Sequence, residues 1–230
     1  FKVVGEIEKD RGLGMTSMRT RERLLERLSE KGISDVRVLE ALRDIPRHLF
    51  LDEALASRAY EDLSLPIGNQ QTISQPYIVA RMTEILVQEE RFTQRPLKNT
   101  LEIGTGCGYQ AAILSLFSDK VTSIERIRSL HDKAKRNLDK LKIRNVSLVF
   151  GDAYNFLEED KFDSILLAAA PEEVPKKILS SLVNGGRLIA PVGNTKKQDL
   201  VLITKIDKEK YKHEKIEEVL FVPMLDGVID

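Results

Sequence analysis

The sequence lacks the features of an extracellular or membrane protein. Its single cysteine, Cys107, cannot form a disulfide within the chain, which fits a reducing cytoplasm. No apolar run approaches the roughly 18 residues of a membrane span, and no signal-like apolar segment opens the chain. These absences favour a cytoplasmic protein without a membrane partner.

Net charge and clustered metal ligands are also missing. Lys plus Arg and Asp plus Glu each number 36 in 230 residues, so no overall positive field attracts nucleic acid. The three histidines, His48, His131 and His213, lack the spacing of a metal site. No G-x-S-x-G motif surrounds Ser74, so a hydrolase triad has no anchor. We expect a monomer that binds neither nucleic acid nor metal.

Charge is absent from one stretch in particular. The 18 residues from Leu63 to Ala80 contain no Asp, Glu, Lys or Arg, although the chain is 31% charged. The stretch is not simply apolar, because it holds Ser64, Asn69, Gln70, Gln71, Thr72, Ser74 and Gln75. A segment that keeps polar groups and excludes every charge is a candidate binding surface.

Periodicity predicts an α/β fold. Apolar stripes within residues 24–28, 38–42 and 78–86 indicate three N-terminal helices, and Pro76 suits the first turn of the third. Residues 93–100 read as a loop. Strands are expected at 100–104, 120–125, 146–152, 162–170, 187–193, 199–206 and 217–224.

Helical patterns separate most of these strands, at 108–117, at 129–143 and in a segment opened by Pro171. No helical pattern separates the last two strands, so we expect them to pair antiparallel. Strands that alternate with helices predict an open, doubly wound, mostly parallel sheet.

A glycine loop follows the first of these strands. Gly104, Thr105, Gly106 and Gly108 lie between strand and helix, where such sheets bind ligands. The spacing is G-x-G-x-G and differs from the G-x-G-x-x-G of the dinucleotide fingerprint. The alternative is that these glycines only form a tight turn and bind no ligand.

Acidic residues mark the same ends of the strands. Glu102 precedes the loop and would disfavour a pyrophosphate, but it suits the ammonium and sulfonium of S-adenosylmethionine. Glu125, 17 residues after Gly108, ends the next strand, where an acid accepts ribose hydroxyls. Asp152, followed by Ala153, ends the third strand and could accept from the adenine amino group. Taken singly, Glu125 and Asp152 could also be solvated charges.

Five segments resemble protein-L-isoaspartate O-methyltransferases, in order along the chain. They are "PIGNQQTISQPYIVA" (66–80), "LEIGTGCGYQAA" (101–112), "FDSILLAAAPEEVP" (162–175), "NGGRLIAPVG" (184–193) and "FVPM" (221–224). The glycine segment alone indicates a methyltransferase, whereas "TISQP" is far more specific. The resemblance implies a Rossmann-like, seven-stranded, mostly parallel sheet of the S-adenosylmethionine-dependent methyltransferase type, with N-terminal helices.

The resemblance also implies site residues and partners. The substrate would be the α-carboxylate of L-isoaspartyl residues in damaged proteins and peptides. The family's active-site serine falls on Ser74, and Thr72 and Ile73 beside it would bridge substrate and methyl donor. Val222 and Pro223 would lie along the substrate peptide, and Gln198 matches a common glutamine. Departures include Cys107, Ala153 and Ala168, where many members have Ser, Gly and Thr.

This resemblance sets the expected organisation. Residues 1–17 are expected to be an extension or a tag remnant, and residues 18–230 a single methyltransferase domain. Within it, residues 18–98 would form the helical and substrate-loop part, and residues 99–230 the cofactor-binding sheet and C-terminal strands. Two alternatives stay open: a methyltransferase of this fold acting on a small-molecule or other protein carboxylate, and a non-catalytic cofactor-binding module.

The uncharged stretch has a physical explanation in this setting. A carboxylic acid with a pKa near 4 is ionised at neutral pH, so as a nucleophile it needs orientation rather than a base or a metal. A nearby acid would repel it, and a close cation would bind the attacking lone pair. Hydroxyl groups such as that of Ser74 can orient it. The bland alternative is that Ser74 only caps the helix before Pro76.

Overall fold

The computed structural model describes residues 14–88 and 97–230. Most of the expected extension at residues 1–17, and residues 93–96 of the expected loop, lie outside the described residues. Within them, a seven-stranded sheet has the order β5-β4-β3-β6-β7-β8-β9. Its strands are β3 (Leu97–Ile103), β4 (Ser118–Glu125), β5 (Val146–Phe150), β6 (Phe162–Leu167), β7 (Leu182–Gly193), β8 (Gln198–Asp207) and β9 (Lys210–Val219).

The sheet is parallel from β5 to β7, and β8 and β9 are antiparallel additions. The chain runs from β3 to β4 and β5 on one side, then returns to β6 and β7 on the other. A crevice therefore opens at the carboxyl ends of β3 and β6, where the winding direction reverses. The predicted doubly wound, mostly parallel sheet is confirmed, as is the antiparallel pairing of the last two strands.

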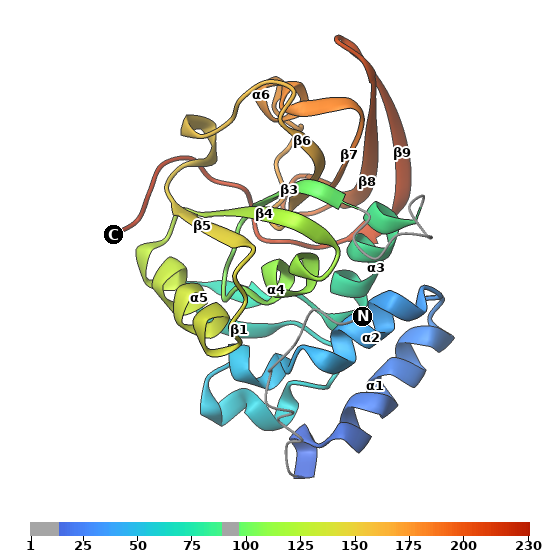
Figure 1. Ribbon diagram of the computed structural model, residues 1–230, viewed down its shortest axis with the longest axis vertical. Coiled ribbons are helices and arrows are strands. Elements are labelled where there is room, and N and C mark those ends of the chain that lie inside the picture. The colour runs from blue at the N-terminus through green and yellow to red at the C-terminus, as the bar shows by residue number, and fades with distance from the viewer. Residues whose placement is uncertain (1–13, 89–96) are drawn as a thin grey trace.

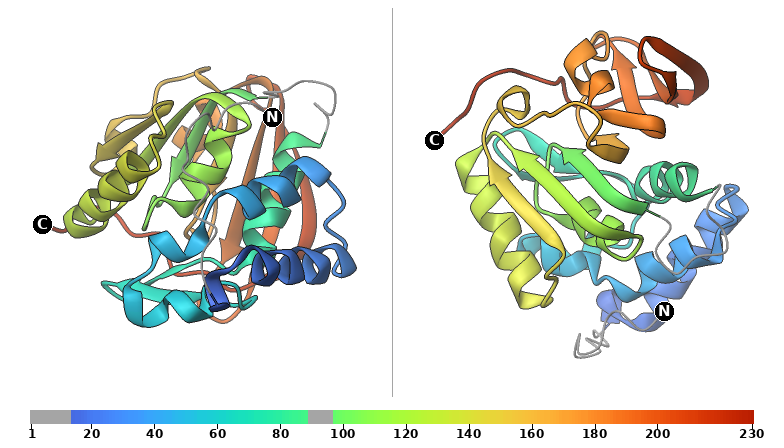
Figure 2. Two further views of the ribbon diagram at one scale, coloured as in Figure 1. Left: turned by 60° about the horizontal axis from the view of Figure 1, so that its bottom comes forward. Right: turned by 45° about the horizontal axis from the view of Figure 1, so that its top comes forward.

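Helices cover both faces of the sheet (Figures 1 and 2). One core cluster joins the sheet to the N-terminal helices, α3, α4 and α5, and a second joins it to α6. The helices are α1 (Met18–Glu30), α2 (Val36–Asp44), α3 (Pro76–Val87), α4 (Tyr109–Ser115), α5 (Arg128–Lys140) and α6 (Lys176–Ser180). Short 3-10 turns are η1 (Gly14–Thr16), η2 (Arg47–Phe50), η3 (Glu53–Arg58) and η4 (Ala153–Asn155). No helix of the described ranges is long and apolar enough to span a bilayer.

A small hairpin precedes α3 and was not predicted. Its strands are β1 (Leu65–Gly68) and β2 (Gln71–Ile73), which pair antiparallel apart from the main sheet. Asn69 and Gln70 form the turn with φ of 50° and 57°, the left-handed conformation that a tight two-residue hairpin turn requires. The hairpin holds the centre of the uncharged stretch.

Some predicted boundaries were wrong. The helix expected from Pro171 begins only at Lys176, after Pro175. Residues 97–100 belong to β3 rather than to a loop. The last strand ends at Val219, because the chain then leaves the sheet and forms an isolated parallel bridge between Pro223 and Ala170.

Strand β7 carries a long bulge near its start. Leu182 pairs with Phe162 and Arg187 pairs with Ser164, so the intervening residues loop out of the ladder. Asn184 and Gly185 are exposed at this bulge.

Candidate active site

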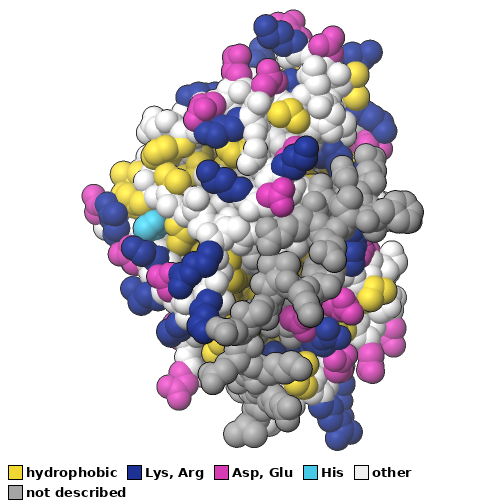
Figure 3. All heavy atoms as spheres, viewed as in Figure 1, with side chains coloured by type: hydrophobic (Ala, Val, Ile, Leu, Met, Phe, Trp, Pro, Cys, Tyr) yellow, Lys and Arg dark blue, Asp and Glu magenta, His cyan; other side chains and the backbone are white. Residues whose placement is uncertain are grey.

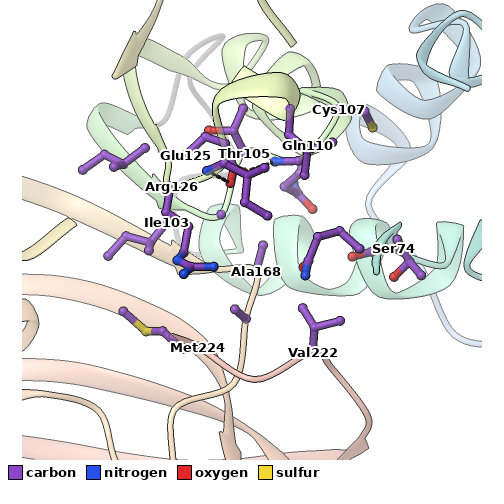
Figure 4. Close-up of a pocket in the computed structure, with 18 of the residues that line it drawn as sticks. Ser74, Ile103, Thr105, Cys107, Gln110, Glu125, Arg126, Ala168, Val222 and Met224 are labelled. Atoms are coloured by element: carbon purple, nitrogen blue, oxygen red, sulfur yellow. Dashed lines mark hydrogen bonds between the residues drawn. The ribbon is translucent and has the colours of Figure 1, made fainter. Parts of the chain in front are cut away.

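A cleft lies at the carboxyl ends of β3, β4, β5 and β6. It encloses about 990 Å³, counting its open mouth, and the β1–β2 hairpin and the segment after β9 close its sides. Figure 4 shows Ser74 on the side of the cleft opposite Ile103 and Arg126, with Val222 and Met224 along its lower edge. Most of the residues that the sequence singled out line this cleft: Thr72, Ile73, Ser74, Gly104, Thr105, Gly106, Glu125, Asp152, Ala153, Val222 and Pro223.

The glycine loop forms the floor of the cleft. Gly104 and Gly106 have φ of 96° and 56°, which glycine adopts without steric cost. A Cβ on Gly106 would lie 3.2 Å from the Ile67 side chain of the hairpin, so the loop and hairpin approach closely. Gly108 does not line the cleft. It is the N-cap of α4 with a φ of 89°, and a Cβ there would press against Ala134 of α5.

Glu125 is held rigidly beside this loop. Its carboxylate accepts hydrogen bonds from the backbone N–H of Gly106 at 2.8 Å and of Ile127 at 2.9 Å. Burial raises the pKa of Glu125, and these backbone hydrogen bonds act in the opposite direction. Each carboxylate oxygen keeps a lone pair for a further donor, as the predicted contact with ribose hydroxyls requires.

Asp152 lies across the mouth, at the end of β5. Its Oδ1 accepts from the Tyr154 N–H at 3.0 Å, and its Oδ2 accepts from the Gly227 N–H at 2.7 Å. Ala153, which follows it, is buried against the cleft. Two acidic groups with spare acceptor capacity therefore stand at this end of the cleft.

Glu102 requires a correction, because its side chain does not line the cleft. It is fully buried within β3, opposite Ser123 of β4. The Ser123 hydroxyl donates to one carboxylate oxygen and contacts the Thr105 hydroxyl at 2.6 Å, while the other carboxylate oxygen has no partner among the described residues. Glu102 therefore supports the loop from beneath and does not meet a ligand directly.

Ser74 links the hairpin to α3. The helix cap is Gln75, without a side-chain cap bond, and Asp62 accepts from the Tyr77 N–H at 2.8 Å instead. Within the described chain, the Ser74 hydroxyl has no hydrogen-bond partner. The alternative that Ser74 only caps the helix is therefore wrong, and its hydroxyl is available to a ligand.

A second hollow adjoins the cleft at Thr72, Ser74, Ala168 and Val222, which line both. It extends along α3 and the segment after β9, and Glu217 and Glu218 are its charged lining residues. Such a groove can lead an extended chain up to the cleft.

Gln198 also requires a correction. It is buried and lines neither hollow. Its side-chain amide accepts from the Phe221 N–H at 2.6 Å and donates to the Phe221 carbonyl at 3.1 Å. Gln198 thereby fixes the segment that carries Val222 and Pro223, without reaching a substrate itself.

The structure adds lining residues that sequence reasoning missed. Gln110 projects from α4, Ala168 follows β6, and Arg126 follows Glu125. The signal for Arg126 was present in the sequence, because residues just past a parallel strand face the crevice. Gln110 gave no such signal.

Cys107 lines the cleft, but its side chain is nearly inaccessible. Burial raises the pKa of its thiol to about 11, so almost no thiolate forms at neutral pH. Cys107 is therefore a buried residue of the loop and not a nucleophile.

The fold and cleft together define the class of Rossmann-like methyltransferases. The family model described as "Protein-L-isoaspartate(D-aspartate) O-methyltransferase (PCMT)" matches residues 19–228. A protein-L-isoaspartate O-methyltransferase from Methylobacillus flagellatus is 54% identical over 94% of this chain and 96% of its own length. One from Pseudomonas paraeruginosa is 49% identical over 94% of this chain and its full length.

Solved structures give the same result. A Plasmodium falciparum chain, assigned as a protein-L-isoaspartate O-methyltransferase and bound to S-adenosyl-L-homocysteine, is 25% identical with a TM-score of 0.75. The match covers 88% of this chain and 97% of that one. Another protein-L-isoaspartate O-methyltransferase is 31% identical with a TM-score of 0.76, over 91% of this chain and 67% of its own. The chain belongs to the protein-L-isoaspartate(D-aspartate) O-methyltransferase family.

Proposed function

We propose that the chain transfers a methyl group from S-adenosylmethionine to the free α-carboxylate of L-isoaspartyl residues in damaged proteins and peptides. The methyl ester then closes to a succinimide, which starts repair. Family membership supports the reaction. The observation that supports the acceptor site is the Ser74 hydroxyl, which has no partner in the described structure and borders both hollows.

The residues of the cleft fit an adenosyl ligand. Glu125 and Asp152 offer carboxylate lone pairs to hydroxyl and amino donors, and the backbone from Gly104 to Gly106 allows close approach. Thr105 and Ala153 complete this side, and Glu102 supports it from beneath. When bound, S-adenosylmethionine supplies an electrophilic methyl group on a sulfonium.

The chain's own residues orient the acceptor. A substrate carboxylate is already ionised, so the hairpin has to hold it in line and away from bulk water. The Ser74 and Thr72 hydroxyls can donate to one carboxylate oxygen while the other stays free to attack. Ile73 is buried beneath them and keeps the loop in place. No general base is required.

The segment after β9 would hold the substrate peptide. Val222 lines both hollows, as Ser74 does, and Pro223 lines the main cleft. Gln198 fixes this segment through Phe221, so we assign Gln198 a positioning role. At the far end, Arg81 forms an ion pair with Glu217, with 3.4 Å between Nε and Oε1.

A matched peptide pair tests the function. One peptide contains L-isoaspartate and its twin contains aspartate at the same position, and transfer of labelled methyl groups is measured. We expect transfer to the isoaspartyl peptide only. Transfer to other carboxylates instead would indicate a different substrate class, and cofactor binding without any transfer would indicate a non-catalytic module.

We further propose that residues 18–230 act as one domain and that the enzyme is a cytoplasmic monomer without a nucleic-acid partner. The zero net charge supports the absence of a nucleic-acid partner, and the single buried cysteine fits a reducing cytoplasm. Light scattering of the purified protein at working concentration tests the oligomeric state.

A further inference from the structure

The C-terminal segment, residues 220–230, crosses the mouth of the cleft. Two backbone hydrogen bonds of 2.8 Å, on either side of Pro223, hold it to Ala170 after β6. Two more of 2.8 Å hold Ile229 to the backbone of residues 126 and 128 after β4. In Figures 1 and 2 the segment leaves the side of β9 and ends beside α5. It therefore ties together strand ends that border the cleft.

Between these anchor points the side chains of Arg126 and Asp152 hold the segment. Arg126 donates from Nε to the Gly227 carbonyl at 2.9 Å and from Nη2 to the Asp226 carbonyl at 3.1 Å. Gly227 in turn donates its N–H to Oδ2 of Asp152 at 2.7 Å. Since Tyr154 holds Oδ1, the carboxylate is fixed from both sides.

We propose that Arg126 and Gly227 are positioning residues. Together they form a clasp that holds the Asp152 carboxylate in one orientation, so that Asp152 favours a nucleoside whose base carries an amino group. This inference rests on the proposed cofactor. A carboxylate is acceptor-only, so it binds an amino donor and repels a carbonyl oxygen. A free carboxylate can rotate away from a wrong base. The clasped one cannot, because its two oxygens are already engaged by backbone donors.

The conformation of Gly227 supports this role. Its φ is 74°, which strains any residue with a side chain. A Cβ at this position would meet no atom of residues 14–88 and 97–230 within 4 Å, so packing within these ranges does not explain the glycine. Its conformation lets the same residue present its carbonyl to Arg126 and its N–H to Asp152.

The test compares two ligands that differ at one position of the base. S-adenosylhomocysteine carries the amino group, and S-inosylhomocysteine carries a carbonyl there. Calorimetric titration of both into the full chain gives a discrimination ratio for wild type, Arg126→Ala and Gly227→Ala. We expect each variant to lower this ratio by about tenfold, the usual effect of losing hydrogen bonds to a charged group. The decrease should come mainly from weaker binding of S-adenosylhomocysteine.

Arg144→Ala is the matched control. Arg144 is an exposed arginine paired with Asp139, and it does not line the cleft, so the ratio should stay at the wild-type value. Equal weakening of both ligands by Arg126→Ala and Gly227→Ala would overturn the clasp, as would unchanged affinities. If the wild type bound neither ligand, the proposed cofactor would fall together with the clasp. Binding without altered discrimination in the variants would refute the clasp alone.

Discussion

At the scale of single residues, Glu102 holds a carboxyl group that water does not reach. Burial raises its pKa to about 8 from an ordinary value of 4.5, against the opposing hydrogen bond from Ser123. Between these values the folded protein keeps the proton and the unfolded chain releases it. Raising the pH across this window therefore favours unfolding. Below the window both states are protonated, and above it both are ionised.

We therefore expect Glu102→Gln to change the pH dependence of stability. The free energy of unfolding of the variant minus that of the wild type should rise by a few kcal/mol between about pH 4.5 and pH 8, because the glutamine has no proton to lose. Urea titrations of both proteins across this range measure the difference, in which ionisable groups that do not interact with Glu102 cancel. Parallel curves for the two proteins would show that Glu102 does not hold its proton.

Ser74 gives a prediction about turnover. Ser74→Ala should lower kcat by about 10- to 1000-fold, as for the loss of one orienting hydrogen bond in a transition state. Stability and cofactor binding should not change, because the hydroxyl has no protein partner in the described structure. Ser29→Ala, on the exposed side of α1, is the control for a lost hydroxyl. Wild-type kinetics in Ser74→Ala would remove Ser74 from the acceptor site.

Some site residues were predictable and others were not. Glu125, Asp152, Gly104 and Gly106 follow from their places at strand ends, where parallel sheets bind ligands. Glu102 was misplaced because the sequence does not tell whether a residue near a strand end still lies inside the sheet. The pairing of Gln198 with Phe221 joins residues 23 apart through one side chain, and no local pattern reveals it.

At the scale of elements, the hairpin concentrates the uncharged stretch at the cleft. Strands β1 and β2 have only four and three residues, which is too few for an alternating pattern to stand out. The sequence therefore revealed that this stretch lacks charge but did not predict that it forms a hairpin. Longer elements with strong periodicity, such as α1 and β8, were predictable. The end of β9 was not, because the chain leaves the sheet to pair with Ala170 far away in sequence.

A charge introduced into the hairpin should reduce turnover in a way that depends on salt. Thr72→Asp should reduce turnover far more than cofactor binding, because two carboxylates a few ångströms apart in a partly dry cleft repel each other by several kcal/mol. Added salt should partly restore Thr72→Asp by screening this repulsion, whereas Ser74→Ala should not respond. Turnover at several ionic strengths distinguishes the two. Equal salt responses would argue against a charge effect.

At the scale of the whole molecule, the formal charges sum to zero. On the face in Figure 3, positive and negative side chains are mixed over the described residues. The reaction likewise needs no bound cation, since the acceptor is already an anion. The protein's chemistry therefore depends on orientation within one crevice.

Metal removal tests this view directly. Treatment with a strong chelator should leave activity intact, because the acceptor is ionised without help from a Lewis acid. Methyl transfer to the isoaspartyl peptide is compared before and after dialysis against the chelator. A loss of activity that a single divalent ion restores would contradict the proposed mechanism.

We expect the bulge of β7 to be a site of spontaneous deamidation. Asn184 and Gly185 are exposed there, and glycine has no side chain to shield its backbone nitrogen. That nitrogen can attack the preceding side-chain amide and release ammonia, leaving a succinimide that opens largely to isoaspartate. A protein molecule with isoaspartate at position 184 would then be a substrate for other molecules of the same enzyme. Stored protein should accept labelled methyl groups without added peptide, and Asn184→Ser should abolish the increase that storage produces.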